Sequence, residues 1–147
     1  MIEAVPSLDD LEQMAENFRL SAKWLIAAIF PNYKVFAQYA RVGYHTVTKL
    51  DYPESVQSLR VIFQMIDAYR RYVNDNGETE MAKVLDHIVL HGISKETEDA
   101  LVYMSNEFDD LRGFTAERGC EYAIRVKQIL LNELHKDIPS KEETYDG

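Results

Sequence analysis

The sequence predicts an all-α protein, folded as one compact bundle or orthogonal array of five to six helices. Apolar side chains recur every three or four residues along most of the chain, which is the spacing that forms one buried face on a helix. Glycine and proline, which interrupt helices, account for only 6 and 4 of the 147 residues. Hydrophobic residues make up 46% of the chain, so a core can form without disulfides or a metal.

The organisation of the chain predicts a single domain over residues 1–147. This length is close to the commonest domain size, and we see no internal repeat, low-complexity tract or linker. The residues from about 138 to 147 are mostly polar, and we expect them to form a frayed or disordered tail.

The first helix is predicted to begin after Ser7, which suits an N-cap, and to carry Asp9 and Asp10 in its first turn. Pro31 ends it. Residues 24–30 are apolar on every side of the helix, which predicts a central position or contact with a second chain, so a homodimer is allowed. The predicted inner face is Leu8, Leu11, Ala15, Phe18, Ala22, Leu25 and Ile29.

Residues 33–50 allow two interpretations. Apolar residues at helical spacing predict a short helix that closes near Gly43, whereas residues 44–48 are rich in β-branched and aromatic side chains and could be extended. We favour two short helices. The residues that indicate the first of them are Tyr33, Phe36, Ala37 and Ala40.

A longer helix is predicted to begin at Asp51-Tyr52-Pro53-Glu54. The aspartate can cap, proline suits the first turn, and Glu54 lies three residues after Asp51, as in a capping box. The helix stops at residues 74–77, Asn-Asp-Asn-Gly. Its predicted inner face is Val56, Leu59, Ile62, Phe63, Ile66, Tyr69 and Val73.

Three further helices complete the prediction. The first ends at Gly92, the second is capped by Ser94, and the third is capped by Thr115 after a break at residues 112–114. The predicted inner faces are Met81, Val84, Leu85 and Ile88 in the first, Leu101, Met104, Phe108 and Leu111 in the second, and Cys120, Ala123, Ile124 and Leu134 in the third.

Charge is distributed unevenly along the chain, whose formal net charge is −9. Residues 19–74 hold eight bases against three acids, and residues 75–121 hold four bases against twelve acids. The overall acidity argues against indiscriminate binding to DNA, because phosphates require a basic surface. The basic stretch nevertheless leaves room for a local contact with nucleic acid.

The same composition favours a cytoplasmic protein that does not enter a membrane. The N-terminal residues 1–6 are acidic, unlike a secretory leader, and the single cysteine, Cys120, cannot form an internal disulfide. The longest wholly apolar run, residues 24–30, is too short to cross a bilayer.

Motifs for specific enzyme chemistry do not occur, and we expect no cofactor. The sequence lacks a phosphate-binding glycine loop, a dinucleotide fingerprint and a nucleophile elbow. His87 and His91 lie four residues apart and share a helix face, so they are weak candidates for a metal site. A metal protein or enzyme with a site around these histidines is therefore the third hypothesis.

Residues 36–50 resemble a helix-turn-helix. Ala37, Val42, Thr46-Val47 and Leu50 fall at compatible offsets, whereas Arg41 replaces the usual turn glycine and Gly43 comes two places late. The resemblance covers about fifteen residues and lies inside the basic stretch. It implies a DNA-binding regulator, our alternative hypothesis. The residues that would reach a DNA groove are Arg41, Tyr44, His45, Thr48 and Lys49.

The acidic region from Asp75 to Glu121 supports the leading hypothesis, a non-enzymatic regulatory protein that docks a protein partner. Such a surface fits a basic partner by charge complementarity, as in inhibitors, immunity proteins and anti-defence proteins. The partner-binding residues that we predict are Glu98, Asp99, Asp109 and Asp110.

Overall fold

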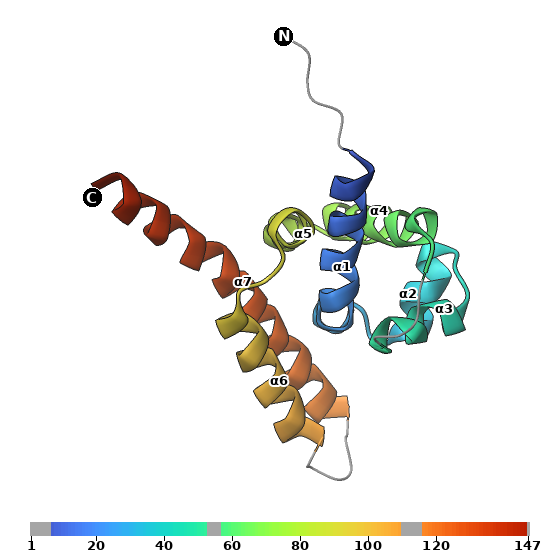
Figure 1. Ribbon diagram of the computed structural model, residues 1–147. Coiled ribbons are helices and arrows are strands. Elements are labelled where there is room, and N and C mark those ends of the chain that lie inside the picture. The colour runs from blue at the N-terminus through green and yellow to red at the C-terminus, as the bar shows by residue number, and fades with distance from the viewer. Residues whose placement is uncertain (1–6, 53–56, 110–115, 147) are drawn as a thin grey trace.

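The computed structural model describes residues 7–52, 57–109 and 116–146, with the side chains of Asp51, Asp109, 116–119 and 136–146 outside that description (Figure 1). The all-α prediction is confirmed: the described chain is 86% helical and contains no strand. It forms seven helices, six of them at least seven residues long, so the predicted count of five to six holds for the longer helices.

Helix α1, Leu8–Ile29, lies at the centre of the fold and begins as predicted. The Ser7 hydroxyl accepts from the Asp10 amide at 3.1 Å, and the Asp10 carboxylate accepts from the Ser7 amide at 3.2 Å, which forms a reciprocal capping box. The apolar end of α1 is buried inside this chain, where Trp24, Leu25 and Ile26 are at most 3% exposed. None of the described helices combines the length and apolarity that crossing a bilayer requires.

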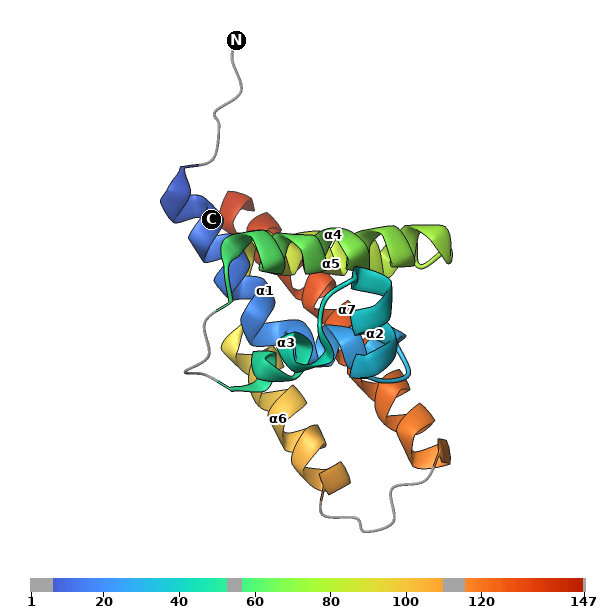
Figure 2. The ribbon, with the colours of Figure 1, turned by 90° about the vertical axis from the view of Figure 1, so that its right-hand side faces the viewer.

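Residues 33–50 form two short helices, as favoured. Helix α2, Tyr33–Ala40, and helix α3, Tyr44–Thr48, meet at a corner and are followed by a 3-10 turn, η1, Lys49–Asp51. Figure 2 shows α2 and α3 below α4. Arg41, which links α2 to α3, has φ 61° and ψ 43°, the left-handed conformation. No other non-glycine residue among those described has a positive φ.

Helix α4, Leu59–Asp75, begins later than predicted. Ser58 is its N-cap and accepts from the Val61 amide at 3.3 Å, so the predicted start at Asp51 is wrong. Asp51 instead ends η1, and Tyr52 is extended (φ −105°, ψ 118°), the conformation that a following proline favours. Pro53 and Glu54 lie outside the described residues. Helix α5, Thr79–His91, ends at Gly92 as predicted.

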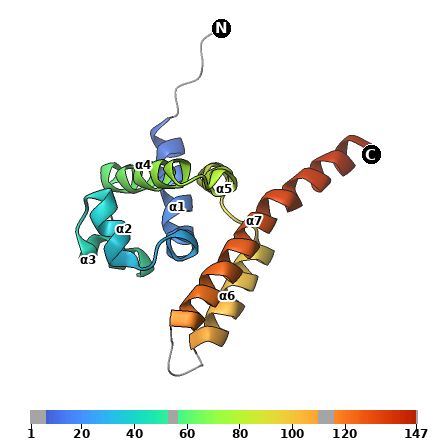
Figure 3. The same ribbon diagram turned by 180° about the vertical axis from the view of Figure 1, so that it is seen from behind.

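The last two helices, α6 (Lys95–Asp109) and α7 (Ala116–Asp146), run antiparallel and side by side (Figure 3). Ser94 caps α6 as predicted, because its hydroxyl accepts from the Thr97 amide at 3.2 Å. Helix α7 continues past residue 138, where we predicted a frayed tail. Lys141, Glu142 and Glu143 are good helix formers, whereas Pro139 removes one backbone N–H donor from this part of the helix.

The buried face of α7 is rotated relative to the prediction. Val126 and Leu130 are fully buried, whereas Cys120 is exposed and Ile124 is 57% exposed, so the predicted inner face is wrong at both positions. Apolar residues occur on several sides of this helix, and periodicity alone therefore does not select the side that meets α1 and α5.

Five aromatic rings pack where the end of α1 meets α2 and α4. Phe30 lies at the middle, 4.9 Å from Phe36 and 4.2 Å from Tyr72 between ring centroids. The hydroxyl of Tyr69, a fully buried residue, donates to the Leu25 carbonyl at 2.6 Å and so joins α4 to α1. Burial raises the pKa of Tyr69 well above its ordinary value of 10.0, with the negative charge of Glu78 adding to the effect.

Replacing Tyr69 by phenylalanine removes this hydrogen bond and leaves the Leu25 carbonyl without that donor. We expect Tyr69→Phe to lower the free energy of unfolding by about 1–2 kcal/mol at neutral pH, measured by urea titration. The raised folded-state pKa means that Tyr69 contributes fully to stability below pH 10 and loses this contribution as pH rises further, since ionisation then favours the unfolded chain. The wild-type protein should therefore lose stability above pH 10 more steeply than the variant, and parallel curves would contradict the assignment.

Candidate functional site

A shallow groove of about 300 Å³ lies between α6 and α7. Its apolar lining comes from Ala100, Tyr103 and Met104 on α6 and from Ile129 on α7. Its polar lining consists of an acid, a base and an amide, which are Glu107, Arg125 and Gln128. The groove therefore has an apolar floor with charged groups at its edge, a combination that suits an amphipathic ligand.

Tyr103 is the most exposed large hydrophobic residue among those described, at 68%. Asp99 lies four residues before it and Glu107 four residues after it, so both carboxylates share its face of α6. Asp99 also bonds Lys95, with the lysine nitrogen 3.0 Å from the carboxylate, and this contact raises the pKa of Lys95. An aromatic side chain thus stands between two acids on the surface of α6.

The predicted partner-binding acids do not form one cluster. Asp99 lies beside Tyr103, whereas Glu98, also exposed, lines a second hollow together with Arg19 and Lys23 of α1. Asp109 is the last residue of α6, and its side chain lies outside the described part of the chain, as does Asp110. The predicted acids therefore lie on α6 or next to it, and the sequence analysis singled out neither the groove nor Tyr103.

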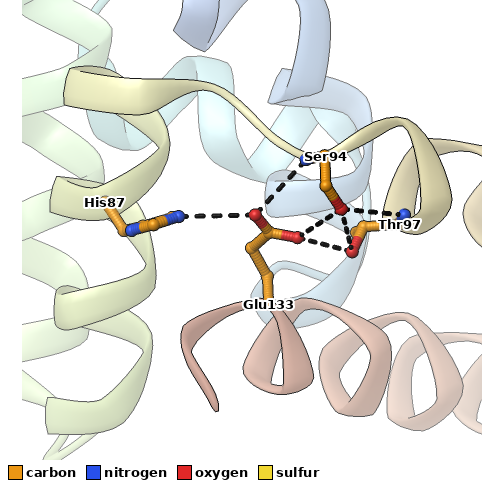
Figure 4. A network of polar contacts seen from close by, with 4 residues as sticks. All are labelled: His87, Ser94, Thr97 and Glu133. Carbon is orange, nitrogen blue, oxygen red and sulfur yellow. Dashed lines mark hydrogen bonds and ion pairs between the residues drawn. The ribbon is translucent and has the colours of Figure 1, made fainter. Parts of the chain in front are cut away.

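A buried carboxylate, Glu133 of α7, fixes the base of the α6–α7 pair (Figure 4). One of its oxygens, Oε1, accepts from the Ser94 hydroxyl at 3.0 Å and from the Thr97 hydroxyl. The other, Oε2, accepts from the Ser94 amide at 3.3 Å and lies 3.4 Å from Nε2 of His87. One side chain thus joins α7 to α5 and to the first turn of α6.

The position of Glu133 explains how a carboxylate, 6% exposed as a residue, is tolerated in the core. It lies at the N-terminus of α6, where unpaired amides and the helix dipole favour negative charge. Two hydroxyls and an amide satisfy its oxygens, which offsets the loss of solvation. The acid therefore sets the axial position of α7 along α6, and through it the shape of the groove.

Two more polar contacts hold the pair against the rest of the protein. The Trp24 indole nitrogen donates to the Ser105 hydroxyl at 3.2 Å, and that hydroxyl lies 3.0 Å from the Tyr122 hydroxyl, which joins α1, α6 and α7. Lys127 of α7 donates to Glu78 beside α5 at 2.7 Å. These hydrogen bonds fix α6 and α7, the two helices that form the groove, against α1 and the start of α5.

The two predicted metal candidates do share one helix, with their ring centroids 5.2 Å apart. His87 contacts Glu133, whereas His91 is exposed at the end of α5. Within the described residues, no three histidine, cysteine or acidic side chains are placed to hold a metal ion together. His87 is half-buried, and its side chain contacts Glu133.

The predicted DNA-contacting residues do come together at the α2–α3 corner. Arg41, Tyr44, His45 and Lys49 are exposed, and Thr48 is half-buried with its hydroxyl bonded to the His45 carbonyl at 3.0 Å. Helix α3 is only five residues long, and η1 follows it directly.

No protein-family model, curated protein or solved structure matches this chain.

Glu133 is the residue that sequence analysis missed, although a signal exists. It lies seven residues after Val126 and three after Leu130, on the same face as these two buried residues. An acid on an apolar face indicates a buried polar contact, but its partners, Ser94 and Thr97, are 39 and 36 residues away. Their identity follows only from the fold.

Substitution of Glu133 should destabilise the whole protein. We expect Glu133→Ala to lower the free energy of unfolding by about 3 kcal/mol, because it leaves two hydroxyls and an amide without their acceptor. Circular dichroism during urea titration measures the effect. The control is Asn132→Ala at the exposed neighbouring position, where about 0.5 kcal/mol or less is expected. A loss of that small size at Glu133 would show that the buried network contributes little.

Proposed function

We propose that this chain is a non-enzymatic, cytoplasmic regulatory protein that binds a protein partner through the α6–α7 groove. The proposed occupant is a basic amphipathic helix of that partner. The observation that carries the proposal is Tyr103, which is 68% exposed at the edge of an apolar groove and stands between Asp99 and Glu107.

An exposed tyrosine beside an apolar groove supplies the chemistry of a binding anchor. Its ring offers a large apolar area at low conformational cost, and its hydroxyl forms a hydrogen bond when a partner covers it. Ile124 of α7, 57% exposed, lies four residues before the groove residue Gln128 and adds apolar area on this side of the helix pair. Covering these side chains would remove them from water, which favours association.

Charge supports a basic occupant. Glu107 lines the groove together with Arg125, and Asp99, which pairs with Lys95, flanks the anchor on its other side. Over residues 75–121 the chain carries twelve acids against four bases, so the region as a whole is negative. A partner with lysine or arginine along its polar face would be attracted at long range and oriented on contact. A second copy of this chain would bring the same negative surface, so a homodimer through this groove is disfavoured.

The geometry supports a helix as the occupant. Two helices packed side by side leave a lengthwise groove, and a third helix fits such a groove with side chains at every third or fourth position. The polar side chains at the groove are a carboxylate, a guanidinium and an amide, from Glu107, Arg125 and Gln128. These groups orient a partner, whereas covalent catalysis needs a nucleophile beside a base.

The proposal is tested with a fluorescein-labelled model peptide that carries leucine on one helical face and lysine on the other. Fluorescence anisotropy measures its binding to the full-length protein. We expect Tyr103→Ala to weaken binding about tenfold or more, because the anchor is lost. Glu107→Lys should weaken binding and reduce its salt dependence, because the attraction is partly reversed.

The matched control is Glu12→Lys, which makes the same change of charge at an exposed position on α1. It should leave binding within about twofold of wild type, since its only effect is through net charge. Equal effects of Glu107→Lys and Glu12→Lys, or unchanged binding in Tyr103→Ala, would overturn the proposed site. Sedimentation of the protein without peptide measures its self-association. Protein dimers that Tyr103→Ala abolishes would show that a second copy of the chain occupies the groove instead.

A further inference from the structure

The chain contains a long segment without acids, which the acidic groove does not explain. It has 25 acidic residues, yet none lies between Glu16 and Asp51. Average composition would place about six acids in a segment of that length. The same segment contains five bases: Arg19, Lys23, Lys34, Arg41 and Lys49. This asymmetry exists inside a protein whose net charge is −9.

Among the residues that the structure describes, the bases of the α2–α3 corner differ from most others in forming no ion pair. Elsewhere ion pairs neutralise Arg70 with Asp86, Arg71 with Asp67, and Lys127 with Glu78. Among the described residues, Lys34, Arg41, Lys49 and Arg60 form no ion pair, and all four are exposed. Their charge is available to an external anion.

Side-chain contacts bring part of this charge together. The Gln64 amide of α4 donates to the carbonyls of Ala40 at 2.9 Å and Arg41 at 3.3 Å, which fixes the first turns of α4 against the corner. Arg60 lies four residues before Gln64, on the same face of α4. Lys49 follows His45 by one helical turn. Arg41, Arg60 and Lys49 therefore come from neighbouring elements of the corner, with α4 tied to the Arg41 carbonyl through Gln64.

Arg41 occupies a position where an L-residue is strained. Its φ of 61° suits glycine, and an arginine there costs folding free energy. Its guanidinium forms no ion pair with the described residues that would offset this cost, and the side chain is exposed. The left-handed conformation itself ends α2, because the Arg41 amide donates to the Gln38 carbonyl at 3.3 Å and the Val42 amide donates to the Ala37 carbonyl at 3.1 Å. These contacts do not explain why the residue is an arginine instead of a glycine, and such local costs are common at ligand-binding positions.

Two tyrosines provide flat surfaces beside the charges. Tyr44 is 50% exposed at the start of α3, and Tyr52 is 56% exposed just after η1. Exposed rings stack on nucleobases, but only on bases that are not already stacked inside a duplex. Helix α3 spans about 7.5 Å at five residues, which is short for reading base edges along a groove.

We infer that the corner formed by α2, α3, η1 and the start of α4 binds single-stranded nucleic acid, with Arg41, Lys49 and Arg60 on phosphates and Tyr44 and Tyr52 stacked on bases. This binding is separate from the proposed α6–α7 function and involves none of the groove residues. Local positive charge overcomes the overall acidity because screening limits the repulsion from distant acids at ordinary salt.

The test uses full-length protein and labelled oligothymidylate of about 20 nucleotides, its uridylate counterpart and a duplex of equal length, at about 50 mM salt. The wild-type protein should bind one or both single strands more tightly than the duplex, and the two single strands distinguish DNA from RNA. Tyr44→Ala should weaken binding at least about fivefold through lost stacking. Lys49→Gln should make the logarithmic salt dependence shallower by about 0.7, the contribution of one phosphate contact.

The Arg41→Gly variant separates an effect on nucleic-acid binding from an effect on folding. It removes the charge and the strain together, so binding should weaken at least about fivefold while the midpoint of thermal unfolding is unchanged or higher. Arg41→Asn, which also tolerates the left-handed conformation, provides a second variant should the glycine protein fold poorly. Lys83→Gln is the charge-matched control, because Lys83 lies on α5 and pairs with Glu80. Tighter binding to the duplex, no binding of either single strand, or equal losses in Arg41→Gly and Lys83→Gln would overturn the inference.

Discussion

The burial of the second half of α1 is the constraint on which the rest of the structure depends. Helices α4, α5 and α7 and the turn η1 all contact this one helix. Trp24, Leu25 and Ile26 point in different directions around it, and each is at most 3% exposed. A helix that is apolar on every side is stable in water only when neighbours surround it, and this requirement places the other elements.

Polar groups on α1 then specify which neighbour lies where. The Leu25 carbonyl accepts from Tyr69 on α4, and the Trp24 indole donates to Ser105 on α6. Hydrophobic burial does not depend on direction, so many packings of the same helices would bury similar apolar area. A packing that separates Tyr69 from the Leu25 carbonyl, or Trp24 from Ser105, costs the free energy of an unsatisfied buried polar group.

Sequence reasoning succeeded where the information is local. Ser7 and Ser94 act as helix caps through contacts three residues away, and the face of α5 formed by Met81, Val84 and Leu85 is buried as its spacing indicates. It failed at the start of α4, where Ser58 and Asp51 both suit a cap and the extended Tyr52 decides between them. The inward face of α7 and the partners of Glu133 depend on residues far away in sequence, and no local pattern contains that information.

The charges of the folded protein also separate in a way that composition alone does not reveal. Residues near α6 are acidic and surround an apolar groove, whereas the α2–α3 corner carries bases without described ion-pair partners. In Figures 1 and 3 these two regions lie on opposite sides of α1. Opposite charges at such a distance interact weakly through solvent, so each surface keeps its own potential.

The α6–α7 groove and the α2–α3 corner each contain one residue that costs folding or solvation free energy, unlike an ordinary solvated surface. Tyr103 exposes an aromatic ring that could have been polar, and Arg41 adopts a backbone conformation that glycine would adopt without strain. No described hydrogen bond or ion pair uses the Tyr103 ring or the Arg41 guanidinium, whereas side-chain caps begin α1, α4 and α6 as local rules expect. Departures from local consistency in an otherwise consistent fold are expected where a residue acts on something outside the chain. The exposed ring at the groove and the arginine in a left-handed position at the corner are both such departures, although the chemistry and the proposed partners of the two surfaces differ.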